Sequence, residues 1–469
     1  MIRDLQGLDP DTAEAVQTAV RRGVMTAVDG SFRPDDALTQ GELLALLQAL
    51  ETLQPEQMPM MHKGREVFLD NNSATVEIRH GDCAVQVTGK ELTAPPCSNV
   101  VALDYGGYGT IRGCHLYKDQ PNEVNHGPGA AGVNALVSVA HDSRVEISDC
   151  ILESNSYGGT GVYLDGEQSY AYLNRVKIRT HQPHSRGVYT YYNSTVVLND
   201  CEVETDMNQC AAVATDTGNG SIMVYGGKYL SHGSGSPACY CTGDIRCHNA
   251  HLEATGAEGA VIVGRNTIVL ENCWLRGWKN WGLMFHQAGD SADKQDYCPS
   301  FEMTNGRFET VEGPALYYKE VSKEAYVILR NVEMVTHSGI LLSYTMERGY
   351  GKGPGGLAVL QGYNQKLEGA VIGDRFADVA IELAEGSSLK STINEKNNMR
   401  SVSVTLDAGS TLSLTGNSYI TVLKDADETL SNIIGNGFTL TYDAAAAENA
   451  WLAGRSIPLS GGGSLVPNA

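Results

Sequence analysis

One short motif recurs nine times between Thr110 and Met334 and limits the possible folds more than any other feature. It reads apolar-x-apolar-x-(Asp/Asn/Gly/Arg)-small-x-apolar, as in VEISDCIL ending at Leu152 and IVLENCWL ending at Leu275. The sixth residues of the nine copies are Cys114, Cys150, Val176, Cys201, Gly227, Ala250, Cys273, Gly306 and Val332. Successive copies lie 23 to 36 residues apart. A period in this range is typical of solenoids and propellers.

The pattern inside each copy selects one kind of solenoid. Alternation of period two indicates strands, and Asn, Gly and Asp between the runs indicate turns. A propeller blade needs four strands in about 40 residues, which these shorter repeats do not supply. Three short strands per repeat predict an all-β fold, a right-handed parallel β-helix of pectate-lyase-like architecture. The aligned small residues should then stack as an inward ladder.

The segments on either side of the repeats predict the domain organisation. Asp9–Pro10 is a helix start, and Thr39 with Glu42 forms a capping box before LLALLQAL. We therefore predict a small α-helical N-terminal cap at 1–53, a linker at 54–65, the β-helix at 66–442 and a closing segment at 443–469. The insertion at 117–132, which is rich in Gly, Pro and Asn, the insertion at 286–300 and the segment 349–356 are predicted loops.

Two stretches resemble known families. The segment AVRRGVMTAVDGSFRPDDALTQGELLALL resembles one S-layer homology motif, over about 45 residues. In that family three such motifs together bind cell-wall polymer, whereas this chain carries one; its helices would alternatively shield the end coil of the solenoid. The repeats, followed by SVSVTLDAGSTLSLTGNSYITVL, look like the adhesin-like β-helix proteins of anaerobic bacteria. This second resemblance covers most of residues 66–469. It implies a fold and a surface-associated role, without catalytic residues.

Composition narrows the partners and the cellular location. The 34 basic and 55 acidic side chains give a net charge of −21, which argues against nucleic acid and anionic membranes as partners. No run of 18 apolar residues predicts a membrane span. MIRDLQGLDP contains no apolar leader core. We expect the cell surface or secretion if a leader was removed, and the cytoplasm otherwise.

The cysteines are predicted to be structural. Four of the eleven occupy the small position of the repeat, which suits buried core residues. Cys239, Cys241 and Cys247, with His248 and His251, are rich in metal-ligand types. Alternation, however, places the three thiols inward and the two imidazoles on the opposite face, so no metal site and no cofactor are predicted.

A second aligned strand follows each small residue and is predicted to expose tyrosines. Its outward positions are expected to be Tyr163, Tyr189, Val213, Tyr240, Val261, Met284, Leu316 and Leu341. Beside them run Asp165, Tyr191, Thr215, Thr242, Val263, His286, Tyr318 and Ser343, and a third column holds Tyr192, Asp216, Arg265, Gln287 and Lys319. With coils roughly 4.8 Å apart, these residues should form a continuous face.

Three functions fit such a face. The first is a groove for a polysaccharide or oligosaccharide, with ligand-binding residues Tyr163, Tyr189, Tyr191, Tyr192, Tyr240, Arg265, Gln287 and Tyr318. The second is an interface, covered by loops or by another copy of the chain in a homo-oligomer. The third is a carbohydrate-active enzyme, either a glycosidase or a lyase. The sequence favours a surface-associated, glycan-binding or adhesin-like protein without its own catalysis.

The catalytic alternative would use carboxylates or a base in the same groove. Asp165 and Asp216 lie two coils apart, roughly 9–10 Å, near the upper end of the spacing used by inverting glycosidases. A lyase would instead use a base such as Lys319, Arg265 or His286, together with a group that neutralises the sugar acid. The catalytic candidates are therefore Asp165, Asp216, His286 and Lys319.

Overall fold

The computed structural model describes residues 59–62, 65–68, 74–78, 85–121, 132–286, 298–321, 323–346 and 355–468. The chain divides into two compact units, Met1–Asn72 and Ser73–Ala469. In the first unit, strands β1 (Pro59–His62) and β2 (Arg65–Phe68) pair in antiparallel fashion. The predicted N-terminal helices and the central parts of the three predicted loops lie outside the described residues.

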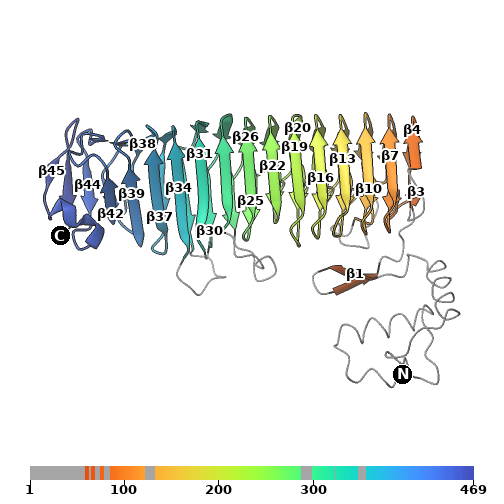
Figure 1. Ribbon diagram of the computed structural model, residues 1–469, viewed down its shortest axis with the longest axis horizontal. Helices are drawn as coiled ribbons and strands as arrows, with labels where there is room; N and C mark the ends of the chain where they lie inside the picture. The colour runs from red at the N-terminus through yellow and green to blue at the C-terminus, as the bar shows by residue number, and fades with distance from the viewer. Residues whose placement is uncertain are drawn as a thin grey trace, which may run out of the picture. The chain divides into compact units, whose positions relative to one another are not determined.

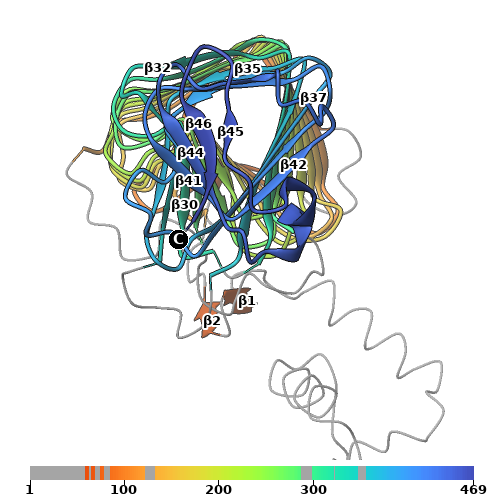
Figure 2. The same ribbon diagram turned by 90° about the vertical axis from the view of Figure 1, so that its left-hand side faces the viewer.

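The second unit is a parallel β-solenoid of about 14 coils, in which each coil contributes a strand to up to three sheets (Figures 1 and 2). The first sheet has 14 strands. It consists of β4 (Val85–Thr88), β7 (Tyr108–Arg112), β10 (Arg144–Ser148), β13 (Tyr170–Asn174), β16 (Thr195–Asn199), β19 (Ser221–Tyr225), β22 (Asp244–His248), β25 (Thr267–Glu271), β28 (Ser300–Thr304), β31 (Ala325–Arg330), β34 (Leu357–Tyr363), β37 (Asp378–Ala384), β39 (Ser401–Leu406) and β42 (Val422–Asp425).

The second and third sheets complete the coils. The second consists of β5 (Glu91–Thr93), β8 (His115–Lys118), β11 (Ile151–Ser154), β14 (Lys177–Thr180), β17 (Glu202–Thr205), β20 (Lys228–Ser231), β23 (His251–Ala254), β26 (Trp274–Gly277), β29 (Arg307–Thr310) and β32 (Glu333–Thr336). The third consists of β3 (Ala74–Ile78), β6 (Asn99–Leu103), β9 (Val137–Val139), β12 (Val162–Leu164), β15 (Val188–Thr190), β18 (Val213–Thr215), β21 (Cys239–Cys241), β24 (Ala260–Val263), β27 (Leu283–His286), β30 (Leu316–Lys319), β33 (Ile340–Thr345) and β36 (Ala370–Gly373).

Two four-stranded sheets occupy the C-terminal coils. One contains β35 (Lys366–Glu368), β38 (Ser388–Ser391), β40 (Thr411–Leu414) and β43 (Ile433–Ile434), and the other contains β41 (Ser418–Ile420), β44 (Thr439–Tyr442), β46 (Ser464–Pro467) and β45 (Ile457–Pro458). The short 3-10 helix η3 (Ala447–Leu452) precedes β45, which pairs antiparallel with β46. Among the described residues, no helix has the length and apolar character of a membrane span.

The repeated motif forms the corner between the first and second sheets. Its fifth residue has a positive φ, as at Asp149 (54°), Asn272 (52°) and Asn331 (54°). Asp, Asn and Gly adopt this left-handed conformation at low cost, which explains why they dominate the position. The next residue is buried in seven of the nine copies, as at Cys150 and Cys273, whereas Gly227 is partly exposed and Gly306 is exposed. The predicted parallel β-solenoid is therefore confirmed, and so is the inward ladder apart from Gly227 and Gly306, while the right-handed, pectate-lyase-like type stays a prediction.

Apolar side chains from the three sheets stack into one continuous core. Ile147 lies between Ile111 and Leu173 in strict parallel register, and all three are buried. Equivalent positions in successive coils thus bury equivalent side chains, so each coil covers its neighbours. The prediction that Cys239, Cys241 and Cys247 point inward is confirmed, because all three belong to this core.

Candidate ligand-binding face

The outer face of the third sheet carries two columns of side chains, but their register differs in part from the predicted one. Strand pairing gives a first column of Tyr163, Tyr189, Ala214, Tyr240, Val261, Met284, Tyr317, Ser343 and Ile372. Three predicted members are off by one or two sequence positions and lie in the core instead: Val213, Leu316 and Leu341. In these strands apolar residues occupy consecutive positions, so alternation alone does not separate the two faces.

The same shift changes the second column. Backbone hydrogen bonds place Asp165, Tyr191 and Asp216 in consecutive coils, and strand pairing places Val263, His286, Lys319 and Thr345 further along. Asp216 therefore occupies the position predicted for Thr215. The predicted outward position of Tyr318, a candidate ligand-binding residue, is wrong, because this side chain stacks on Phe285 inside the core with ring centroids 5.0 Å apart.

The tyrosines of coils β12 to β21 form a cluster of their own, separate from the solenoid core, which we call the tyrosine cluster (Tyr163, Tyr189, Tyr191, Tyr192 and Tyr240). Ring centroids of Tyr163 and Tyr189 are 6.1 Å apart, and those of Tyr189 and Tyr191 are 4.8 Å apart. The equivalent residues Tyr163 and Tyr189 thus lie next to each other in successive coils, as predicted, with their rings edge to face. The predicted exposure is wrong for Tyr163, Tyr189 and Tyr191, each of which is at most 2% exposed. Tyr192 and Tyr240 are partly buried.

Turns leading into the third sheet cover these rings. Ala135 and Ala211 pack in the cluster, and a Cβ at Gly132 would lie within 2.1 Å of the Tyr163 ring. The Asn99 amide holds the first turn by donating to the carbonyl oxygens of Gly132 and Ala135 at 2.7 and 3.1 Å. The backbone therefore fits closely over the rings, at a position where a side chain would clash.

A buried ammonium group also anchors this turn. Lys118 is 1% exposed, and its Nζ donates to the Ser98 carbonyl oxygen at 2.7 Å and to the Asn134 side-chain oxygen. Lysine is rarely buried unless all its donors find acceptors. Its position explains how a turn without regular structure is held against the tyrosine rings.

Asp216 accepts hydrogen bonds from the covered phenols. Tyr189 Oη lies 2.6 Å and Tyr191 Oη 3.0 Å from Asp216 Oδ2, and the two phenol oxygens are 2.7 Å apart. The Arg186 guanidinium lies over the Tyr189 ring, 4.1 Å from its centroid, a favourable cation–π contact. Burial raises the pKa values of Tyr189 and Tyr191. Both phenols are therefore hydrogen-bond donors at neutral pH.

Asp165 occupies the equivalent position two coils earlier. It accepts a hydrogen bond from Tyr163 Oη at 3.3 Å, and burial raises its pKa, while the charge of His141 opposes that shift. His141 is hydrogen-bonded to Asp104 and stacks on Tyr105 at 4.9 Å. The hydrogen bond to Asp104 raises the pKa of His141.

The four predicted catalytic residues do not converge. Tyr191, which is buried, occupies the coil between Asp165 and Asp216, so these carboxylates do not face a shared open space for water. His286 and Lys319 are neighbours in the register. His286 lies three coils beyond Asp216, roughly 14 Å at the usual spacing. Burial, followed by the charge of Lys319, lowers the pKa of His286. Arg265 is half-buried, and Gln287 lies outside the described residues.

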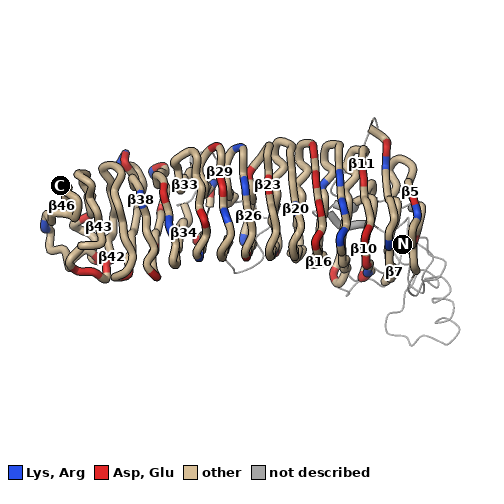
Figure 3. The backbone as a smooth tube through the Cα atoms, turned by 90° about the horizontal axis from the view of Figure 1, so that it is seen from above, with Lys and Arg blue, Asp and Glu red and all other residues tan. Residues whose placement is uncertain are grey.

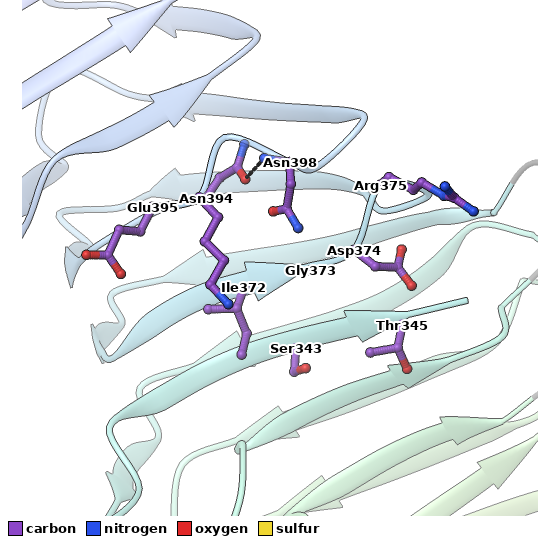
Figure 4. Close-up of a pocket in the computed structure, with 10 residues that line it drawn as sticks. Ser343, Thr345, Ile372, Gly373, Asp374, Arg375, Asn394, Glu395 and Asn398 are labelled. Atoms are coloured by element: carbon purple, nitrogen blue, oxygen red, sulfur yellow. Dashed lines mark hydrogen bonds between the residues drawn. The ribbon is translucent and has the colours of Figure 1, made fainter. Parts of the chain in front are cut away.

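Towards the C-terminus the same face opens into a cavity of about 490 Å³, which we call the polar pocket (Figure 4). It is lined by Ser343, Thr345, Ile372, Gly373, Asp374, Arg375, Asn394, Glu395, Lys396 and Asn398. Ile372 continues the first column, and its side chain is 39% exposed. The pocket thus combines one exposed apolar surface with charged and amide groups, as small-molecule sites commonly do.

Local hydrogen bonds shape the polar pocket. Asn394 Oδ1 accepts from the backbone N–H groups of Asn398 and Met399, both at 3.1 Å. Asp374 accepts from the backbone N–H groups of Met346 and Phe376 at 2.5 and 2.9 Å. These two side chains are therefore structural. Arg375, Glu395, Lys396 and Asn398 remain exposed, so their polar groups are available to a ligand.

An aromatic pair lies one coil before the pocket. The Trp281 and Tyr317 rings stack at 4.2 Å, and Tyr317 Oη lies 2.7 Å from Thr345 Oγ1, a pocket residue. Both rings are partly exposed. Trp281 lies two residues before β27, and neither Tyr317 nor the pocket was predicted from the sequence. The signal that would have found the pocket, NEKNN at 394–398, lies in a turn outside the repeated motif.

These features define a parallel β-solenoid with an open polar pocket on one sheet. Residues 2–44 of the same chain match the S-layer homology domain family, which confirms the resemblance of that segment and suggests association with the cell surface. Comparison of the whole chain with curated proteins and with solved structures finds no match.

Proposed function

We propose that this protein is held at the cell wall by its S-layer homology domain and that its solenoid binds a glycan without converting it. The observation that carries the proposal is the S-layer homology match at 2–44, because such domains typically bind cell-wall polysaccharide. A long solenoid on the same chain supplies a rigid, extended surface, which suits binding to an extended polymer.

The polar pocket is the proposed glycan site of the solenoid. Its volume of about 490 Å³ lies within the range of small-molecule sites and suits one or two sugar rings. Ile372 offers an apolar surface for the C–H face of a ring, and Lys396 and Asn398 offer donors for hydroxyl or carboxylate oxygens. The neighbouring Trp281–Tyr317 pair extends the site with an aromatic surface for stacking.

Absence of catalysis in this proposal rests on the separation of the candidate groups. Asp165 and Asp216 accept hydrogen bonds from covered phenols, and His286 and Lys319 lie several coils away. Because Asp165 and Asp216 do not face one open space, this pair does not form the arrangement used by glycosidases.

Wall attachment and glycan binding need separate tests. Cosedimentation with purified cell walls should retain the full chain and lose a variant that lacks residues 2–44. For the solenoid, a glycan array should show binding that the double variant Arg375→Ala/Lys396→Ala weakens at least tenfold. The matched control is Lys390→Ala. Lys390 is a surface lysine that pairs with Glu368, and both residues lie on a different sheet from the polar pocket.

Product analysis on the same glycans decides between binding and catalysis. We expect no new reducing ends and no unsaturated products after prolonged incubation. Turnover that survives in Asp216→Asn and disappears in Lys396→Ala would contradict the non-catalytic part of the proposal and place an enzyme site in the polar pocket.

A further inference from the structure

The outer face of the second sheet, remote in sequence from the polar pocket, holds a group of metal-ligand side chains. Figure 3, a view that includes this sheet, shows both acidic and basic residues along the length of the solenoid. At β17 and β20, donor atoms of Glu204, Asp206 and His232 all lie within 4.8 Å of one another. We propose that these three residues bind a divalent transition-metal ion such as Zn²⁺.

The geometry of the three donors suits a single ion. For three points separated by at most 4.8 Å, a common centre lies no more than about 2.8 Å from each. Zinc bonds to nitrogen and carboxylate oxygen are about 2.0–2.2 Å long, so shifts of well under 1 Å per side chain bring all three into range. His232 Nε2 and Glu204 Oε1 are already 3.0 Å apart, close to the separation of adjacent ligands around a tetrahedral ion.

Strand register explains why these residues converge. Glu204 lies at an outward position of β17, and Asp206 is the first residue after the end of that strand. The backbone N–H of His232 donates to the Thr205 carbonyl oxygen, which places His232 beside Asp206 in the next coil. The ends of these two neighbouring strands therefore bring two oxygen donors and one nitrogen donor together before any ion binds.

Two further residues orient the donors. His232 Nδ1 lies 2.9 Å from Thr255 Oγ1, so the second ring nitrogen is held by a partner while Nε2 faces the carboxylates. His181 Nδ1 lies 2.7 Å from Asp206 Oδ2. An outer partner of this kind is typical of metal-binding imidazoles and carboxylates. Thr255 and His181 are thus positioning residues, each contributed by a neighbouring coil.

The donor set predicts the class of metal. One imidazole with two carboxylates suits zinc and neighbouring transition metals, whereas Ca²⁺ and Mg²⁺ prefer oxygen alone. The side chains of Glu204, Asp206 and His232 are 43%, 42% and 35% exposed, so solvent reaches the site and water can complete the coordination. This inference does not depend on the proposed glycan site.

Calorimetric titration of the chelator-treated full chain with ZnCl₂ tests the site. We expect one saturable site, and His232→Ala should weaken its affinity at least 100-fold. Asp206→Asn should do the same through an uncharged side chain of equal size. Thr255→Val should weaken binding about tenfold, because it removes only the orienting hydrogen bond.

The matched control is His248→Ala. His248 also faces a carboxylate, with Nδ1 2.9 Å from Glu271 Oε2, but it belongs to no such three-residue group among the described residues. It should leave zinc affinity unchanged. Equal weakening by His248→Ala and His232→Ala would show dispersed surface binding and overturn the proposal. So would full affinity in His232→Ala and Asp206→Asn, or competition by Ca²⁺ at equal concentration.

Discussion

The tyrosine cluster and the polar pocket occupy the same two columns of the same sheet, yet one is covered and the other is open. Tyr189 in the first column is fully buried, whereas Ile372 in that column is 39% exposed. The difference lies in the turns that lead into the sheet, because Ala135 and Ala211 pack over the tyrosines. Register therefore determines the direction of a side chain, and the adjoining turns determine its exposure.

Covering changes the chemistry of otherwise similar groups. Phenols under the turns donate hydrogen bonds to Asp216 and contribute to folding, whereas the exposed cations of the pocket, such as Lys396, are free to meet a solute. We therefore expect substitutions in the tyrosine cluster to lower the stability of the fold and substitutions in the polar pocket to weaken glycan binding.

The largest effect is expected from Tyr189→Ala. Removing a fully buried ring leaves a cavity and should lower the free energy of unfolding by about 3–5 kcal/mol. Lys396→Ala in the pocket should change it by less than about 0.5 kcal/mol. Urea denaturation followed by circular dichroism measures both. Equal midpoints for Tyr189→Ala and the wild type would show that the ring is not packed, and the comparison would fail.

A smaller effect is expected when only the hydroxyl group is removed. Tyr189→Phe deprives the Asp216 carboxylate of a donor at 2.6 Å and should cost about 1.5–3 kcal/mol, as for hydrogen bonds to charged groups. Tyr317→Phe, near the pocket, removes a bond between two neutral hydroxyls, Tyr317 Oη and Thr345 Oγ1, and should cost about 0.5–1.5 kcal/mol. Reversal of this order in urea denaturation would contradict the greater burial of the cluster.

The architecture was predictable from the sequence because a solenoid repeats its constraints. Each copy of the motif needs a left-handed residue followed by a small one, as Asp149–Cys150 and Asn272–Cys273 show, so nine weak signals add up. Alternation failed in the strand around Ala214, where five successive residues from Ala211 to Thr215 are all buried.

Covering and pocket formation depend on contacts that have no period. Lys118 reaches Ser98 and Asn134, which lie in different coils, and nothing in the local sequence marks this lysine as buried. Asn394 shapes the pocket through a turn that lies outside the repeated motif. Contact between equivalent tyrosines, as between Tyr163 and Tyr189, was therefore predictable from the repeat, whereas their covering by the turns was not.

The covered half should also respond to pH in a particular direction. Burial raises the folded-state pKa of Asp165 above its ordinary 3.8, with His141 and Tyr163 opposing the shift. The folded state thus holds this proton more tightly than the unfolded state, and stability is lost as pH rises from about 4. Asp165→Asn removes this loss. The melting temperature of the variant minus that of the wild type should therefore increase as the pH rises from about 3 to about 5.5.

That range avoids the titration of His141, whose ordinary pKa is 6.5 and whose folded-state pKa is raised. A constant difference in melting temperature across the range would show that Asp165 is as solvated as an aspartate on an open face. The tyrosine cluster would then be accessible to solvent, contrary to the comparison.

Asp427, in an exposed turn beyond the polar pocket, provides the opposite case and the smallest expected effect. Hydrogen bonds from Ser431, then from Thr429, lower its pKa from 3.8 to about 2. The carboxylate is favoured in the folded state, so its contribution is present above about pH 4 and is lost as pH falls towards 2. The advantage of the wild type over Asp427→Asn in melting temperature should shrink over that interval, opposite in sign to the trend for Asp165→Asn. Parallel trends in the two variants would mean that burial does not distinguish these aspartates, and the contrast between the covered and the open regions would lose its electrostatic basis.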